Sequence, residues 1–155
     1  MISKILVATD GSETALKASR YAVKLAKQLG ASITIMSVVD KRILPSYYVG
    51  PPEATAIYMT ETVEDDLREV AKRYVGRVKK FCEKKAVSCR SVIPSGHPVE
   101  EIIKEAERSR SNLIILGSHG KSALAAVFLG SVTYGVVHKD THVPVLIVRR
   151  GEKGK

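Results

Sequence analysis

Five short apolar segments, each ending at polar or turn-forming residues, are the feature that most limits how this chain can fold. Short continuous apolar runs bounded by turn residues are typical of β-strands that are buried on both faces. Between them lie longer stretches in which apolar residues recur every three or four positions, which is the spacing of an amphipathic helix. We therefore predict strands over 2–8, 32–39, 86–94, 112–116 and 144–149.

Helices are predicted in the intervals between these strands. Ser12 is a good N-cap for the first helix, and Gly30 ends its apolar pattern. The longest helix is expected from about Thr60 to about Lys85, because its apolar stripe steps by four, three, four, four and three residues. Pro98 stands at the first position of a third helix, and a short fourth helix is expected over 131–139.

Alternating strands and helices of this kind form an open, mostly parallel α/β sheet of the Rossmann-like class, with helices on both faces. The 155 residues contain no internal repeat or linker, so we expect one domain over 1–150 and a disordered basic tail over 151–155. In such sheets, ligands bind beyond the carboxyl ends of the strands, where the strand order reverses. Here those ends are residues 8–10 and the segment from Gly117 onward.

Composition limits the classes of function. No apolar run is long enough for a membrane span or a secretory peptide, and two cysteines without a metal-binding pattern favour a reducing, cytoplasmic setting. The net charge of +9 suits a nucleic acid, a membrane surface or a phosphorylated small molecule. Only 5% of the residues are aromatic, the lysines lie on several helix faces and no nucleic-acid motif is found, so sequence-specific nucleic-acid binding is not expected.

Glycines surround the end of the fourth predicted strand. Gly117-Ser118-His119-Gly120 follows that strand, and Gly130-Ser131 follows after nine intervening residues, at the start of a predicted helix. Glycine lets the backbone approach a ligand closely, exposed amides form an anion-binding nest, and a helix start adds free donors. We therefore expect phosphate here, assisted by polar side chains that converge on the loop: Lys121, Ser118, Ser122, Ser131 and Thr133. Any one of these hydroxyls alone fits a cap or a solvated loop group better.

Two common phosphate-binding motifs are absent. A P-loop requires glycine where Ile115 stands, and a dinucleotide fingerprint requires more glycines than the single Gly11 after the first strand. Instead, Gly117-x2-Gly120-x9-Gly130-Ser131 resembles the nucleotide-binding motif of the universal stress protein family, in its ATP-binding branch. The likeness covers essentially the whole chain, because further segments resemble the family at 7–12, 37–40, 96–102 and 143–148.

This resemblance implies an adenine nucleotide alpha hydrolase-like sheet of order 3-2-1-4-5, with ATP and its Mg²⁺ across the ends of strands one and four. It also implies that residues 8–10 border the adenosine, that the Val38 backbone meets adenine, and that the glycine segment lines the ribose and holds the phosphates. The site residues implied are Ala8, Thr9, Asp10, Val38, Gly117, Ser118, His119, Gly120, Lys121, Ser122, Gly130, Ser131, Val132 and Thr133. Ala8 departs from the pattern, because some ATP-binding members have proline there.

Two interpretations of Asp10 stay open. The resemblance places it near the ribose or a phosphate-bound Mg²⁺, whereas an Asp before Gly-Ser at a strand–helix junction is often a turn or cap residue. A metal site made by protein side chains alone is not expected. His138 and His142 have a spacing that suits a helical metal site, but Asp140-Thr141 and the following strand argue against an unbroken helix there.

Together these features predict an ATP-binding regulatory or stress-response protein. The alternative is a slow ATP hydrolase or phosphoryl-transfer protein, for which the sequence offers no convincing base, since His119 has no identifiable carboxylate partner and no catalytic residue is assigned. The apolar strand at 144–149 would lie at the sheet edge and predicts a homodimer. The expected partners are an adenine nucleotide, a second copy and an unidentified protein, without a membrane or a specific nucleic acid.

Overall fold

The computed structural model describes residues 1–43, 56–121, 129–139 and 141–151, with the backbone alone at 56–60. Within these residues, five parallel strands form the main sheet in the order β4-β2-β1-β6-β7. In the numbering of the predicted strands this order is 3-2-1-4-5, so the predicted fold class and strand order are confirmed. The strands of this sheet are β1 Lys4–Ala8, β2 Ser32–Met36, β4 Cys89–Val92, β6 Leu113–Gly117 and β7 Val145–Val148.

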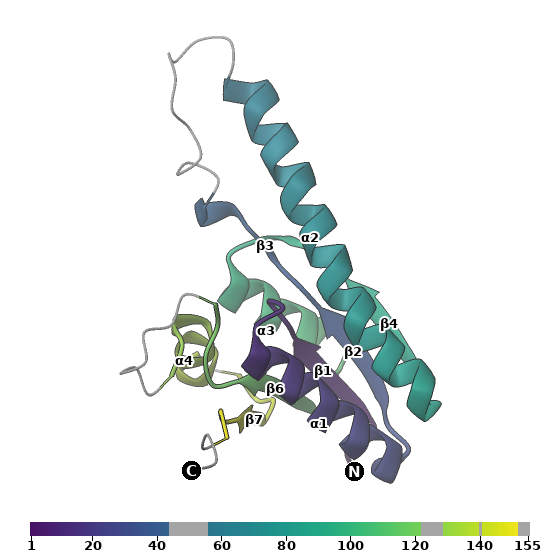
Figure 1. Ribbon diagram of the computed structural model, residues 1–155. Coiled ribbons are helices and arrows are strands. Elements are labelled where there is room, and N and C mark those ends of the chain that lie inside the picture. The colour runs from purple at the N-terminus through teal and green to yellow at the C-terminus, as the bar shows by residue number, and fades with distance from the viewer. Residues whose placement is uncertain (44–55, 122–128, 140, 152–155) are drawn as a thin grey trace.

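Helices cover both faces of the sheet (Figure 1). Two of them, α1 and α2, pack on one face, and α3 and α4 pack on the other. Their bounds are α1 Glu13–Leu29, α2 Ala56–Lys85, α3 Pro98–Arg108 and α4 Ser131–His138. The longest, α2, begins earlier than predicted and extends past the end of the sheet in Figure 1. In the described part of the chain, no helix is long and apolar enough to cross a membrane.

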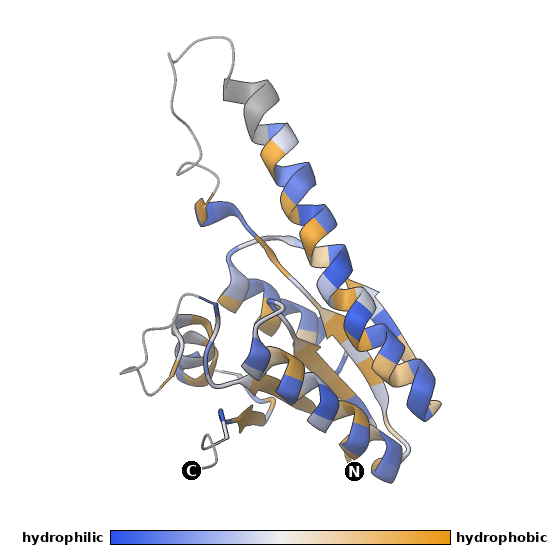
Figure 2. Ribbon diagram, in the orientation of Figure 1, coloured by the Kyte–Doolittle hydropathy of each residue, from blue (hydrophilic) through white to orange (hydrophobic). Residues whose placement is uncertain are grey.

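Each central strand contributes to two separate cores. Ile5 and Val7 of β1 face α1 and α2, whereas Leu6 between them faces α3 and α4. All three side chains have no exposed surface, which explains why the strand is apolar without alternation. Figure 2 shows the same arrangement, with apolar strands between helices whose polar residues face outward.

Two of the predicted strands differ most from the observed ones. The predicted strand at 32–39 ends at Met36, and after a gap β3 (Val39–Asp40) pairs with β5 (Ser95–Gly96) in a separate two-stranded sheet. The cause lies in the adjacent segment that follows β4. Pro94 in that segment has no amide hydrogen, so the ladder of hydrogen bonds between the strands cannot continue through it. Its carbonyl still accepts a hydrogen bond from the Val39 amide at 2.8 Å, so the two chains remain adjacent.

The predicted strand at 86–94 is also too long at its start. Ala86 has a φ of 53°, in the left-handed region, and this turn ends α2. The strand therefore begins only at Cys89 and ends at Val92.

Candidate functional site

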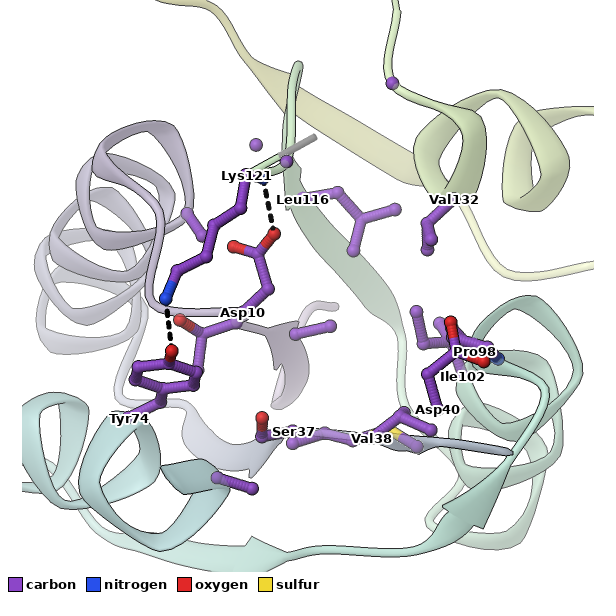
Figure 3. Close-up of a pocket in the computed structure, with 18 of the residues that line it drawn as sticks. Asp10, Ser37, Val38, Asp40, Tyr74, Pro98, Ile102, Leu116, Lys121 and Val132 are labelled. Carbon is purple, nitrogen blue, oxygen red and sulfur yellow. Dashed lines mark hydrogen bonds between the residues drawn. The ribbon is translucent and has the colours of Figure 1, made fainter. Parts of the chain in front are cut away.

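A cavity of about 620 Å³ opens where the strand order reverses, at the carboxyl ends of β1 and β6 (Figure 3). This is the position at which open α/β sheets bind ligands, and the volume suits a small molecule. The predicted residues that line it are Ala8, Thr9, Asp10, Val38, Gly117, His119, Gly120, Lys121, Gly130, Ser131, Val132 and Thr133. Ser118 lies outside the lining, and Ser122 lies outside the described residues.

Val38 contributes an open stretch of backbone to the cavity. The last bond between β1 and β2 runs from the Thr9 amide to the Met36 carbonyl at 2.8 Å. The amides on either side of Val38, those of Ser37 and Val39, donate in the opposite direction, toward the chain that continues β4. Val38 therefore directs its own amide and carbonyl toward the opposite side, where β1 has ended and no longer pairs with this segment. Neither group has a hydrogen-bond partner among the described residues.

Asp10 joins the start of α1 to the glycine segment. Its Oδ1 accepts a hydrogen bond from the Ser12 amide at 2.9 Å, which is the turn role that the sequence left open. Its Oδ2 accepts one from the Lys121 amide at 3.1 Å. A Cβ at Gly120 would lie 2.7 Å from the same Oδ2, so a larger residue there would displace the Asp10 carboxylate. The carboxylate thus has a structural role in the wall of the cavity, and a contact with ribose or Mg²⁺ stays a prediction.

The first turn of α1 also holds the glycine segment. The His119 carbonyl accepts hydrogen bonds from the Thr14 hydroxyl and, at 3.5 Å, from the Ser12 hydroxyl. Ser12 is the N-cap of α1 as predicted, since its Oγ accepts from the Ala15 amide at 3.2 Å. The path of the backbone after β6 is therefore set by side chains more than 100 residues earlier in the chain.

Part of the expected anion nest is occupied by the protein itself. The Gly130 amide donates to the Ser118 carbonyl at 2.7 Å, and the Lys121 amide is bound to Asp10. Four amides along the cavity have no acceptor among the residues that the structure describes: those of Gly120, Ser131, Val132 and Thr133. The last three form the first turn of α4, whose N-cap, Gly130, has no side chain to satisfy them. They present the positive end of the helix dipole to the cavity.

The hydroxyls of two predicted phosphate donors have hydrogen-bond partners within the protein. The Ser118 hydroxyl, in a residue that is 2% exposed, forms a hydrogen bond with His119 Nδ1 at 2.8 Å. The buried Thr133 hydroxyl donates to the Gly117 carbonyl at 2.8 Å. The sequence alone does not show which partner a hydroxyl has, so both were assigned to a ligand.

Comparison with known proteins places this chain. A sequence profile described as "Universal stress protein family" matches residues 1–149. The chain belongs to this family. Two of its relatives are from Methanocaldococcus jannaschii. Universal stress protein MJ0531 is 33% identical over 153 residues, covering 99% of this chain and 85% of the relative. Universal stress protein MJ0577 is 36% identical over 158 residues, covering 97% and 96%.

Solved structures of the family agree with the fold. The structure of MJ0577 covers 99% of both chains with a TM-score of 0.84 and 33% identity. A universal stress protein in complex with cAMP has a TM-score of 0.63 at 21% identity, covering 96% of this chain and 97% of that one. One from Archaeoglobus fulgidus in complex with dAMP has a TM-score of 0.62 at 16% identity, covering 96% and 98%.

In this universal stress protein, α2 and the segment after β3 add lining residues that sequence reasoning did not assign to the site. Tyr74 on α2 belongs to the apolar stripe that predicted the helix, which was the available signal. Arg42 binds Asp40 through its guanidinium, with an Nη2–Oδ2 distance of 2.6 Å. This hydrogen bond is the main reason why the pKa of Asp40 lies below its ordinary value. Arg42 Nη1 also lies 3.4 Å from His97 Nε2.

Proposed function

We propose that this universal stress protein binds ATP, with its Mg²⁺, in the cavity at the ends of β1 and β6, and acts as a nucleotide-dependent regulatory protein. One observation carries the proposal: a single cavity is lined both by an open backbone donor–acceptor pair and by the open amides of a helix N-terminus. A purine base needs the first feature and a phosphate chain needs the second.

The Val38 backbone suits the adenine edge. Adenine presents a ring nitrogen that accepts a hydrogen bond beside an amino group that donates one. The open amide and carbonyl of Val38 offer the complementary pair. Apolar side chains around it, including Met36, Ile102 and Leu116, suit the faces of a flat base.

The opposite part of the cavity suits a phosphate chain. The open amides of Gly120 and of the first turn of α4 have no acceptor in the part of the chain that the structure describes, and the helix dipole favours negative charge there. Lys121 adds a full positive charge. Asp10, which contacts the glycine segment, has the chemistry for a phosphate-bound Mg²⁺, because carboxylate oxygens are preferred ligands of that ion.

The family comparison supports an adenine nucleotide, since two solved proteins of the same fold are complexes with cAMP and dAMP. The wall chemistry favours binding over turnover. Both carboxylates among the described lining residues already have partners: Asp10 accepts from two amides, and Asp40 is paired with Arg42. Neither is therefore an unpaired carboxylate placed to orient water for hydrolysis.

The experiment removes one amide without disturbing the fold. Ser131→Pro deletes the N1 amide of α4, a position that proline tolerates, and Gly130 before it already has the extended conformation that a residue preceding proline adopts. The matched control Ser131→Ala keeps the amide and loses only the hydroxyl. We expect calorimetric titration to show ATP binding to the wild type, weakened about tenfold in Ser131→Pro and less in Ser131→Ala.

Three outcomes decide between the functions. Mass analysis of the supernatant after denaturation is expected to find adenine nucleotide released from the purified protein. Absence of binding at millimolar ATP contradicts the proposal. Release of phosphate at many turnovers per minute in the same samples would instead favour the hydrolase alternative.

We further propose that the protein is a cytoplasmic homodimer that pairs through β7. In the main sheet β7 is an edge strand, and the carbonyls of Pro144, just before it, and of Val148 accept hydrogen bonds from the amides of Ile114 and Ser118. The backbone groups of Val145 and Ile147 therefore point to the open edge, which is a template for a second strand.

A further inference from the structure

Lys121 is held by a neutral partner across the wall of the cavity. Its side chain runs from the glycine segment to α2, where the ammonium donates a hydrogen bond to the Tyr74 hydroxyl (Figure 3). The nitrogen lies 4.3 Å from the centre of the same ring. None of the ion pairs between described residues includes Lys121.

The backbone of Lys121 is fixed while its side chain has a weak partner. Its amide is anchored on Asp10, which also receives the turn bond from Ser12. A phenol hydroxyl and an aromatic face attract an ammonium less than a phosphate oxygen does, because phosphate adds the attraction of opposite charges to the hydrogen bond. When phosphates lie along the neighbouring amides of Gly120, the ammonium has a stronger partner within the same cavity.

Tyr74 is positioned independently of Lys121. Its ring packs directly on Gly11, so closely that a Cβ at position 11 would overlap the ring. Gly11 also has a φ of 76°, in the left-handed region that glycine favours. The ring therefore keeps its place on α2 when the ammonium leaves, and the Lys121 ammonium is the group that changes partner.

We infer that Lys121 recognises the outer phosphates of the bound nucleotide and that Tyr74 is the resting partner it leaves on binding. The inference rests on the proposed function. It specifies which nucleotides the site distinguishes and which contact in the protein changes on binding. The site then discriminates a nucleoside triphosphate from a monophosphate. Occupancy by the triphosphate breaks the contact between the glycine segment and α2, and occupancy by the monophosphate leaves that contact in place.

The test compares ATP, ADP and AMP by calorimetric titration in matched variants. Lys121→Met keeps the length of the side chain and removes the charge. Tyr74→Phe keeps the ring on Gly11 and removes the hydroxyl, and the two are also combined. The control Lys79→Met removes the same charge from an exposed position of α2 outside the cavity lining.

We expect Lys121→Met to weaken the binding of ATP about tenfold and the binding of AMP by less than about twofold, with the effect on ADP between them. Tyr74→Phe is expected to strengthen the binding of ATP by roughly two- to threefold, because the hydroxyl that competes for the Lys121 ammonium is gone. In the Lys121→Met background it is expected to have no effect. Lys79→Met should follow the wild type.

Equal weakening of ATP and AMP by Lys121→Met, or no weakening, overturns the inference while ATP binding itself stands. An effect of Tyr74→Phe that persists without the Lys121 charge overturns the resting-partner role. If the wild type binds none of the three nucleotides, the proposed function fails and the inference fails with it.

Discussion

Two glycines of the motif lie close to the backbone of neighbouring residues. A Cβ at Gly117 would lie 2.8 Å from the Thr14 carbonyl carbon, and one at Gly130 would lie 3.2 Å from the Gly120 amide nitrogen. None of the three motif glycines has a positive φ. At the scale of single residues, Gly117 is therefore explained by close packing on the first turn of α1, and Gly130 by close approach to the backbone at Gly120.

Substitution of Gly117 tests this packing. We expect Gly117→Ala to lower the free energy of unfolding by about 1–3 kcal/mol, because the contacted atoms are helix backbone and cannot move aside. Urea denaturation measures the change. The control is Gly76→Ala in the interior of α2, where a Cβ would meet nothing within 4 Å. It should raise stability by about 0.5–1 kcal/mol. A Gly117→Ala protein as stable as the wild type would contradict the packing argument.

At the scale of elements, local signals were sufficient for β1, α1 and α4. A run such as Ile5-Leu6-Val7 and a cap such as Ser12 act within a few residues, so the sequence predicts them directly. The break after Met36 was missed because it depends on Pro94, which is distant in sequence and adjacent only in the sheet. The position of Tyr74 in the site was missed for a similar reason. A helical stripe indicates a buried face and does not identify what that face covers.

The Asp40–Arg42 pair at the end of β3 predicts a pH dependence. The pKa of Asp40 in the folded protein is below its ordinary value of 3.8, so the pair stabilises the fold at neutral pH and the contribution is lost as the pH falls through that lowered pKa. We expect Asp40→Asn to cost about 0.5 kcal/mol at pH 7, a small value because solvent screens the half-exposed Arg42.

Urea denaturation at pH 7 and below pH 3 tests this pair. The difference between Asp40→Asn and the wild type should shrink in acid. The control Asp66→Asn changes an exposed carboxylate of α2 that has no ion pair among the described residues, and it should show no such trend. A difference that persists at low pH would mean that packing of the side chain, and not its charge, is responsible.

At the scale of the whole molecule, the helices of the described residues cover the two faces of the sheet but leave β7 at its edge. Leu146 and Val148 pack against the core under α1, and Val145 packs against the other core. Ile147 belongs to neither cluster and is only partly buried. The proposed dimer therefore uses backbone groups and a side chain that the folded monomer leaves without a partner in its cores.

A charge at this edge should separate the copies. We expect the wild type to sediment as a dimer and Ile147→Lys to sediment as a monomer with unchanged circular dichroism, because a lysine on an edge strand opposes pairing. The control Leu29→Lys makes the same change at an exposed apolar position at the end of α1 and should stay dimeric. A wild-type monomer at high micromolar concentration would rule out the dimer.

The early end of β1 also affects how the cavity can change during evolution. Because β1 leaves the sheet before its neighbour does, position 38 offers a main-chain amide and carbonyl, and every amino acid except proline carries both. Under the proposed function, exchange of one aliphatic residue for another at this position leaves both groups, and so the proposed contact with the base, unchanged. A change in base preference is therefore expected from insertions or shifts that move the backbone. A comparison of the amino acids at position 38 alone would not reveal such a change.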